Sequence, residues 1–319
     1  MYRVLIASVI VSALAIGSAT AEVVRVGVLK FGTVNWLMET IRINRLDEAE
    51  GYTLEVVPLA GKAATTIAFQ SAAVDLIVSD WVWAMRQNGQ GASYRFFPYS
   101  RALGSAVTRS DSGIGTLCDF TGRPVGVVGG PLDKSWLVLQ ALAAQTCDVD
   151  LSAETQTLYG APPLMSQQLS AEGVDAVVTY WHYAARLMAS GETEVIAVSD
   201  AIETLGIDPV PALVGFVWDR DRSDLDAITK FRRSVDAASA RLAEVDMAWD
   251  QIRPLMKAAD QAEFIALRDR YRDGIATRWT EADTQAAART HALLTDAGGP
   301  AFVEAAGAYD PSVFLGPDD

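Results

Sequence analysis

Cysteine and histidine are scarce in this chain, and basic residues are outnumbered by acidic ones. The sequence has two cysteines and two histidines in 319 residues, and its 26 Lys and Arg against 40 Asp and Glu give a formal net charge of −14. Zinc ribbons and multi-metal centres need more Cys and His ligands than this chain offers. Proteins that hold nucleic acid use an excess of Lys and Arg to neutralise phosphates. We therefore expect neither a metal nor a nucleic-acid partner.

The sequence also lacks the short motifs of common enzyme classes. It contains no G-x-S-x-G, H-E-x-x-H, P-loop or G-x-G-x-x-G pattern. Gly129 and Gly130 form a strand-to-helix turn without the ending of a nucleotide loop, so we interpret them as allowing close approach of a ligand to the backbone. Asp80 with His182 is the only acid–base pair that we can nominate. An enzyme is therefore the alternative rather than the leading hypothesis, and we expect no cofactor.

The longest apolar run lies at the N-terminus. Arg3 precedes an apolar run of about 14 residues, 4–17, and Ala19-Thr20-Ala21 has the small residues of a cleavage site. A membrane anchor needs about 20 apolar residues, so this run is too short. We predict that residues 1–21 are a signal peptide cleaved after Ala21 and that the protein is periplasmic.

Export makes a disulfide between the two cysteines possible. Cys118 comes just before a strand pattern at 123–128, and Cys147 closes the helical pattern that follows. In a strand-then-helix unit the start of the strand and the end of the helix lie at the same end, so we predict a Cys118–Cys147 disulfide. Two independent buried thiols are the alternative.

The mature chain alternates between strand and helix patterns, as expected for an α/β protein with mostly parallel sheets. Its length allows two domains of about 150 residues. Two β/α series are joined by extended stretches at 94–107 and 212–218, and the chain after Asp224 is helical almost to Gly298, with a Pro/Gly-containing tail. We predict lobe 1 from residues 22–104 and 214–319 and lobe 2 from 105–213. The individual patterns are strands at 23–28, 53–59, 75–79, 123–128, 155–158 and 175–178, and helices from 36, at 62–72, 134–146 and 163–170.

An internal repeat supports the two-lobed organisation. Residues 74–86 align without gaps on residues 174–186, with six of 13 positions identical. Each copy is a buried strand, a polar residue, a Trp and a helix start. Because ligands of parallel α/β sheets sit at the carboxyl ends of strands, we expect Trp81 and Trp181 to face an interlobe cleft from opposite sides.

The candidate binding residues follow from this placement. They lie at strand ends and helix starts of both lobes: Asn35, Trp36, Ser79, Asp80, Trp81, Gly129, Gly130, Asp133, Lys134, Ser135, Trp136, Tyr180, Trp181 and His182. An aromatic wall suits a flat or cationic ligand, whereas helix N-termini and Lys134 suit a carboxylate or sulfonate. The charge of the ligand therefore stays open. Trp83 and Tyr183 are equally well explained by packing, and we assign Trp218, Trp249 and Trp279 to the core.

These features together resemble the periplasmic solute-binding proteins of ABC importers. Within that group the chain is similar to the nitrate/sulfonate/taurine type and to the thiamine-precursor-binding (NMT1/THI5-like) proteins, and the stretches 75–83, 129–136 and 180–183 match the family's cleft-lining positions. The resemblance implies a type II periplasmic-binding fold with two extended hinge crossovers, and a non-enzymatic monomer. It also implies capture of a small organic molecule, planar, heterocyclic or of amine or sulfonate type, for delivery to an inner-membrane permease.

The chain departs from sulfonate binders in its many Trp residues and in Asp80, and it lacks the Cys-rich motif of the thiamine-pyrimidine synthase branch. The alternatives are a periplasmic enzyme with pyrimidine-type chemistry and a partner or cofactor-binding protein of a quinoprotein dehydrogenase system. Similar proteins accompany such systems, which makes pyrroloquinoline quinone a candidate ligand for the latter.

Overall fold

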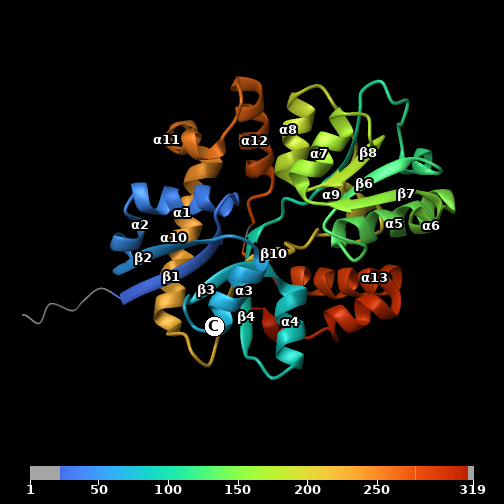
Figure 1. The fold of residues 1–319 in the computed structure, drawn as a ribbon. Helices are drawn as coiled ribbons and strands as arrows, with labels where there is room; N and C mark the ends of the chain where they lie inside the picture. The colour runs from blue at the N-terminus through green and yellow to red at the C-terminus, as the bar shows by residue number, and fades with distance from the viewer. Residues whose placement is uncertain (1–21, 277, 315–319) are drawn as a thin grey trace, which may run out of the picture.

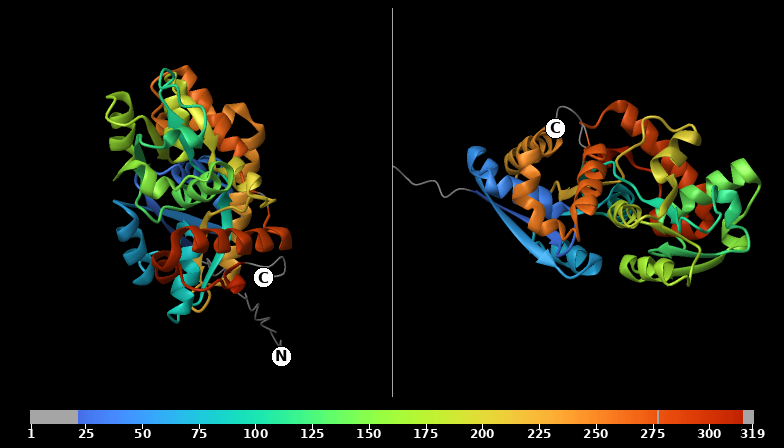
Figure 2. Two further views of the ribbon diagram at one scale, coloured as in Figure 1. Left: turned by 90° about the vertical axis from the view of Figure 1, so that its right-hand side faces the viewer. Right: turned by 90° about the horizontal axis from the view of Figure 1, so that it is seen from above.

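Two α/β lobes lie side by side in the computed structural model, which describes residues 22–276 and 278–314 (Figures 1 and 2). The predicted signal peptide, residues 1–21, lies outside the described residues. Each lobe is built on one five-stranded sheet with helices against it. This arrangement confirms the predicted fold class of two β/α lobes.

Lobe 1 has the strand order β2-β1-β3-β10-β4. Strands β1, β2 and β3 are parallel, and β10 runs antiparallel between β3 and β4. The β-branched residues that predicted these strands point into the core, as in β1, where Val24, Val26 and Val28 are buried. The elements are β1 (Glu22–Leu29), α1 (Val34–Ile43), α2 (Leu46–Ala49), β2 (Tyr52–Leu59), α3 (Lys62–Gln70), β3 (Leu76–Asp80), α4 (Trp81–Gly89), β4 (Tyr94–Ser100) and β10 (Val214–Asp219).

Lobe 2 repeats this plan with the order β7-β6-β8-β5-β9. Strands β6, β7 and β8 are parallel, and β5 runs antiparallel between β8 and β9. The sequence patterns did not predict the short helices α6 and α9 or the edge strand β9 of this lobe, nor the short helix α2 of lobe 1. The elements are β5 (Ser105–Thr108), η1 (Leu117–Phe120), β6 (Pro124–Val128), α5 (Lys134–Cys147), α6 (Leu151–Glu154), β7 (Gln156–Gly160), α7 (Pro162–Ser170), β8 (Ala176–Thr179), α8 (Trp181–Ala189), β9 (Thr193–Ala197) and α9 (Val198–Thr204).

The internal repeat occupies equivalent places in the two lobes. Its copies form β3 with α4 and β8 with α8, and each strand lies third in its sheet. The turns before these strands also match, because Ala72 and Glu172 both have positive φ, at 59° and 57°. The chain crosses between lobes at 101–104 and 205–213. The first crossing lies within the predicted extended stretch 94–107, whereas most of the stretch 212–218 is strand β10 of lobe 1. The proposed lobe boundaries themselves stay a prediction.

The C-terminal helices contact both lobes. Helices α10 (Leu225–Glu244) and α11 (Asp246–Met256) pack on α1 in lobe 1, whereas α12 (Gln261–Asp273) packs on α8 in lobe 2. Helix α13 (Glu281–Ala306) lies against α5 of lobe 2 and α4 of lobe 1, as Figure 1 shows in red.

The end of the chain differs in part from the predicted tail. Helix α13 continues to Ala306 across a break at Gly299, which is followed by Pro300. A short 3-10 turn, η2 (Pro311–Val313), follows, and Phe314 forms a bridge to Phe96 of β4. The predicted tail is therefore partly helical and partly packed on lobe 1. The long helix was underestimated because a Gly-Gly-Pro sequence normally ends a helix.

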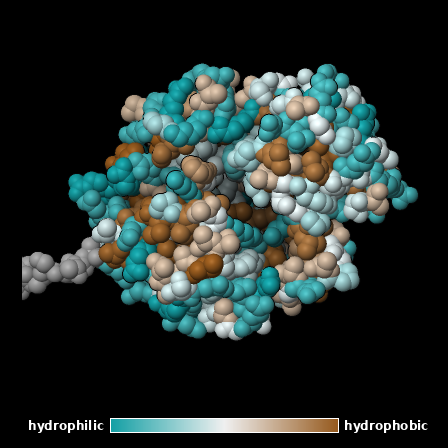
Figure 3. Space-filling model, viewed as in Figure 1, coloured by the Kyte–Doolittle hydropathy of each residue, from teal (hydrophilic) through white to brown (hydrophobic). Residues whose placement is uncertain are grey.

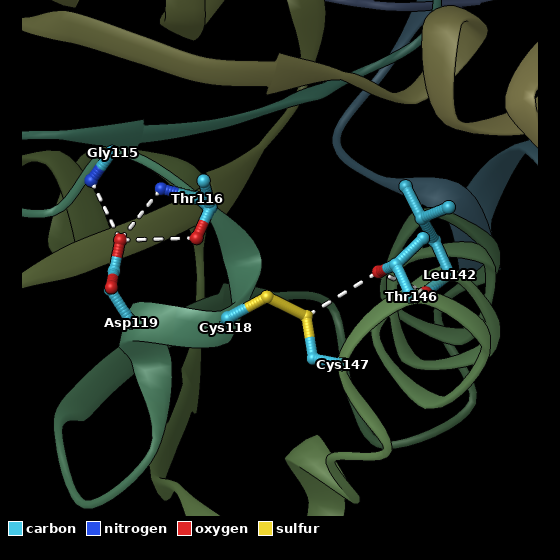
Figure 4. Close-up of a disulfide and its surroundings, with 7 residues drawn as sticks. All are labelled: Gly115, Thr116, Cys118, Asp119, Leu142, Thr146 and Cys147. Carbon is cyan, nitrogen blue, oxygen red and sulfur yellow. Dashed lines mark hydrogen bonds between the residues drawn. A yellow bond between two sulfur atoms is a disulfide. The ribbon is translucent and has the colours of Figure 1, made fainter.

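The predicted disulfide is present in lobe 2. Cys118 in η1 is bonded to Cys147 at the end of α5, with the Cα atoms 5.7 Å apart (Figure 4). Asp119 fixes η1 locally, because its Oδ2 accepts hydrogen bonds from the backbone N–H groups of Gly115 and Thr116 at 3.0 and 2.8 Å. The disulfide therefore joins the segment that leads into β6 to the helix that leaves it.

Three Trp residues that we assigned to the core can be located in the structure. Trp218, Trp249 and Trp279 are buried, which confirms their assignment to the core. Among residues 22–276 and 278–314, no helix has the length and apolar character needed to cross a membrane.

Candidate functional site

A cavity of about 350 Å³ lies between the two lobes. Figure 3 shows the molecule hollowed between its two halves, with hydrophobic residues around the hollow. Lobe 1, lobe 2 and both crossovers contribute to its wall. The lining residues are Gly27, Leu29, Gly32, Thr33, Val34, Lys62, Thr65, Val78, Ser79, Asp80, Tyr99, Ser100, Ala102, Leu103, Gly104, Asp133, Lys134, Ser135, Tyr180, Trp181, His182, Leu213 and Val214.

The position of the cavity follows from strand direction. The carboxyl ends of β1 and β3 in lobe 1, and the helices α5 and α8 that follow β6 and β8 in lobe 2, all reach it. Because the strands of each set are parallel, their carboxyl ends and the N-termini of the following helices meet at one edge of each sheet. The two edges face each other across the cavity, so it receives helix N-termini from both lobes.

Asp80 joins the two lobes electrostatically. Its Oδ1 accepts a hydrogen bond from the backbone N–H of Trp83 at 2.8 Å, which caps α4, and lies 3.2 Å from Lys134 Nζ of lobe 2. Its Oδ2 lies 3.3 Å from Lys62 Nζ of lobe 1. Burial alone would raise the pKa of Asp80, but Lys134, Lys62 and the Trp83 N–H outweigh it and hold the pKa well below its usual range. The carboxylate is therefore ionised and paired with both lysines.

Asp133 plays the corresponding capping role at the start of α5. Its Oδ1 accepts hydrogen bonds from the backbone N–H groups of Ser135 and Trp136 at 3.0 and 3.4 Å. Burial raises the pKa of Asp133, with Lys134 and the two N–H groups acting in the opposite direction. Gly129 makes room for this cap: its φ is +96°, and a Cβ atom there would lie 3.1 Å from Asp133 Oδ2. Gly129 therefore allows the turn between β6 and α5 to form and does not line the cavity.

The two repeat Trp residues differ in position, contrary to the expectation that both face the cleft. Trp181 lines the cavity. Trp81 is fully buried, and its Nε1 donates a hydrogen bond to the carbonyl oxygen of Ala212 at 3.1 Å. The C-terminal segment covers it, with the rings of Tyr309 and Phe314 at 6.5 and 5.9 Å. That segment has no counterpart in the repeat, which is why equivalent positions have different surroundings.

Trp36 and Trp136 are also core residues. Trp36 packs between Trp181, Trp249 and Tyr271 at ring distances of 5.9, 6.2 and 5.7 Å. Trp136 is fully buried. Trp36 is therefore covered by side chains of α8, α11 and α12.

Asn35 and Gly130 also lie outside the cavity wall. The Asn35 side-chain amide donates hydrogen bonds to the carbonyl oxygens of Leu29 and Gly32, at 2.8 and 2.7 Å, and so stabilises the β1–α1 turn. The candidates therefore divide into two groups. Those in the cavity wall are Ser79, Asp80, Asp133, Lys134, Ser135, Tyr180, Trp181 and His182; those outside it are Asn35, Trp36, Trp81, Gly129, Gly130 and Trp136.

His182 is a neutral polar group at the cavity. Burial, together with the positive charge of Arg186, lowers its pKa to about 4. Its Nδ1 is buried and has no hydrogen-bond partner among the described residues. Helix α8 begins one residue earlier, and no described side chain caps its first N–H groups. This end of the cavity therefore offers the uncapped first N–H groups of α8, whereas His182 Nδ1 is buried away from solvent.

Sequence reasoning missed several lining residues, notably Thr33, Lys62 and Tyr99. Lys62 is the first residue of α3, which follows the parallel strand β2. Lys134 was selected because it starts a helix after a parallel strand, and the same reasoning applies to Lys62. Tyr99 lies near the end of β4, which is parallel to β3 because both pair antiparallel with β10. No pattern in the sequence marks that pairing.

Comparisons with known proteins show the fold. No protein-family profile and no curated protein sequence matches this chain. Among solved structures, the alkanesulfonate-binding protein SsuA from Xanthomonas axonopodis pv. citri, bound to MOPS, superposes with a TM-score of 0.66 at 16% identity over 87% of this chain and 94% of that one. The periplasmic aliphatic sulphonate-binding protein SsuA from Escherichia coli gives 0.68 at 14% identity over 90% and 88%. An ABC transporter structure from Parabacteroides distasonis gives 0.70 at 12% identity over 92% and 99%.

The chain therefore has the fold of periplasmic binding proteins. What the site offers chemically is paired charges, hydrogen-bonding groups and aromatic surface. In the ranges that the structure describes, no group of three or more His, Cys, Asp or Glu side chains could hold a metal ion.

Proposed function

We propose that this protein is the extracytoplasmic substrate-binding component of an ABC importer. The observation that carries the proposal is the cavity between two lobes of a periplasmic-binding fold, lined by strand ends and helix starts from both. The names of the similar structures, sulfonate-binding proteins and an ABC transporter, point in the same direction. The protein would act as a periplasmic monomer that delivers its ligand to an inner-membrane permease.

The ligand would be a small organic molecule. Ligand sites typically have volumes of about 300–1,000 Å³, and the cavity of about 350 Å³ is near the lower end. Trp181, Tyr180 and Tyr99 give it aromatic surface, while Ser79 and Ser135 add hydroxyl groups. Aromatic surface favours a planar or heterocyclic ligand, and the charged groups would orient an amine- or sulfonate-type substituent.

Binding would be coupled to closure of the lobes about the crossovers at 101–104 and 205–213. Lys134 of lobe 2 contacts Asp80 of lobe 1, and Trp181 of lobe 2 contacts Trp36 of lobe 1. Opening the cleft would separate these pairs, and closing would restore them around the ligand. The closed arrangement buries the ligand, which lengthens its residence before transfer.

The charges at the site do not favour the two alternatives. The Asp80 carboxylate is engaged by Lys62, Lys134 and the Trp83 N–H, and no hydrogen bond joins it to His182, so the two do not form a proton-transfer pair in this arrangement. A polyanion such as pyrroloquinoline quinone would meet the carboxylates of Asp80 and Asp133 beside the two lysines. Both observations favour binding of a small solute.

The test is a ligand screen on the mature protein, read by thermal shift and tryptophan fluorescence. Amines, sulfonates, pyrimidines and quinone cofactors form the panel. We expect one class to raise the melting temperature and change the emission. Trp181→Ala should weaken its binding by about twofold to tenfold, because an aromatic contact of about 0.5–1.5 kcal/mol is lost.

Trp83 provides a matched control. It is a half-buried Trp that stacks on Tyr94 at 5.5 Å, outside the cavity wall. Trp83→Ala should leave the affinity unchanged. Conversion of the ligand during the screen, or equal affinity for wild type and Trp181→Ala, would contradict the proposal.

A further inference from the structure

Two helices that point at the cavity already carry carboxylates at their N-termini. Asp80 caps α4 and Asp133 caps α5, and both line the cavity. A helix N-terminus attracts negative charge because its first N–H groups are unpaired and the helix dipole is positive there. In this chain the protein itself supplies that negative charge at both helices. An anionic ligand would have to compete with fixed carboxylates for the same N–H groups.

The two cavity lysines are likewise paired within the protein. Lys62 and Lys134 come from different lobes, and both contact the Asp80 carboxylate, at 3.3 and 3.2 Å. The Asp80 side chain is 13% exposed and that of Lys134 is 24% exposed, so solvent screens their interaction only partly. One carboxylate cannot balance two lysines, but Asp133 also lines the cavity, so two lysines stand beside two aspartates before any ligand arrives.

We propose that Asp80 is a specificity-determining residue, which makes the cavity select neutral or zwitterionic organic ligands over simple organic anions. This proposal rests on the proposed solute-binding function and adds the charge class of the ligand. A simple anion would be repelled by Asp80 and would gain no unpaired lysine. A neutral or zwitterionic molecule can hydrogen-bond to the same carboxylate without introducing excess negative charge.

Lobe 2 has different chemistry at the position that corresponds to Asp80. The position equivalent to Asp80 in the repeat is Tyr180, whose side chain carries no charge and does not cap α8. Beside it, His182 is neutral and its buried Nδ1 has no partner among the described residues. Electronegative groups of a ligand can therefore bind at the uncapped first N–H groups of α8, while its hydrogen-bond donors face Asp80. The asymmetry between Asp80 and Tyr180 gives the cavity two ends of different chemistry.

The experiment removes the charge of Asp80 and keeps its capping role. Asn and Ser are both good N-cap residues, so Asp80→Asn and Asp80→Ser retain an acceptor for the Trp83 N–H while releasing both lysines. Three probes of related size are titrated by calorimetry: benzenesulfonate, which is anionic, benzenesulfonamide, which is neutral, and taurine, which is zwitterionic. For wild type we expect benzenesulfonate to bind more weakly than the neutral probe. For the variants we expect its affinity to rise about tenfold, mainly because Lys134, 24% exposed, loses its counter-ion. Lys62 also loses its partner but is 68% exposed, so solvent screens its contribution more strongly.

Two controls separate charge from capping and from folding. Asp224 caps α10 in the same way, accepting from the N–H groups of Asp226 and Ala227, and is not a cavity residue. Asp224→Asn should leave binding of all three probes unchanged. Adding Lys134→Met to Asp80→Asn should abolish the gain for benzenesulfonate.

The proposal is overturned if wild type binds benzenesulfonate as tightly as benzenesulfonamide, or if neither Asp80 variant gains affinity for it. Either result leaves solute binding itself intact. Failure of the proposed function is a different result, namely no ligand in the broad screen or turnover of a bound compound.

Discussion

At the residue scale, His182 is a neutral histidine held at the cavity wall by burial. The unfolded chain takes up its proton near pH 6.5, whereas the folded protein does so only near pH 4. A basic group with a lowered folded pKa contributes stability that is present above the unfolded pKa and is lost as the pH falls. The window for His182 therefore runs from pH 6.5 down to about 4.

We predict that the free energy of unfolding falls on going from pH 7 to pH 4.5 and that His182→Gln reduces this fall. The His182 contribution to the fall is at most about 3 kcal/mol, because each pKa unit corresponds to about 1.4 kcal/mol. Urea unfolding of both proteins at the two pH values measures it. Identical pH dependence of wild type and variant would show that His182 titrates normally.

Of the candidates chosen from the sequence, Asp80, Asp133 and His182 lie in the cavity wall, whereas Trp81 is buried away from it. The N-cap aspartates bond to N–H groups two or three residues away, so local sequence is sufficient to place them. The burial of Trp81 depends instead on Ala212 and on a segment near the C-terminus. The residues next to Trp81 in the sequence form no pattern that predicts contacts with such distant segments.

At the scale of elements, the disulfide between η1 and α5 closes a loop within lobe 2. A cross-link with a separation of 29 residues restricts the unfolded chain, and the chain-entropy account gives about 3–4 kcal/mol for a loop of this length. The bond was predictable because both cysteines flank one strand-and-helix unit. It stabilises the helix whose first turn supplies Asp133 and Lys134 to the cavity.

We predict that the double variant Cys118→Ser/Cys147→Ser unfolds with a free energy about 3–4 kcal/mol below that of the oxidised wild type. Denaturant titrations with and without a reducing agent measure this difference. The reduced wild type should match the variant, and the variant should not respond to the reducing agent. Equal stability of oxidised and reduced wild type would contradict the prediction.

The strand patterns predicted the buried central strands and the edge strands β2 and β7, but missed the edge strand β9. Strands β3 and β8 are short, mostly buried runs of four or five residues, too short for a helix pattern. Strand β9 lies at the sheet edge with mostly half-exposed residues, so its sequence carries little alternation. Its strand conformation depends on antiparallel pairing with β5 in the assembled sheet and not on a pattern in its own sequence.

At the scale of the whole molecule, Tyr271 connects the two lobes. It belongs to α12, and its ring lies 5.7 Å from Trp36 of lobe 1, 6.0 Å from Trp181 of lobe 2 and 5.2 Å from Trp249 of α11. Nearby, Arg186 of α8 forms an ion pair with Glu263, and Arg270 lies 2.5 Å from Glu194. The packing of α12 thus holds lobe 2 against the remainder of the molecule.

We predict that Tyr271→Ala lowers the free energy of unfolding by about 3–5 kcal/mol and increases the radius of gyration, because the aromatic contact between the lobes is lost. Phe264→Ala is the matched control. Phe264 is buried on the same helix, where the Arg253 guanidinium lies 4.4 Å above its ring. It should lose stability without separating the lobes. Small-angle scattering that shows no difference between the two variants would argue against this role of Tyr271.

The sequence by itself determined the two β/α series, the repeat that relates β3–α4 to β8–α8, and the disulfide. These features depend on alternation, spacing and groups within a few residues of one another, which the chain carries locally. Only the tertiary structure decided that Asp80 pairs with lysines from both lobes, that Trp181 rather than Trp81 reaches the cavity, and that α12 and α13 contact both lobes. Those outcomes depend on which distant element covers which face, and side-chain packing between remote segments leaves no local pattern in the sequence.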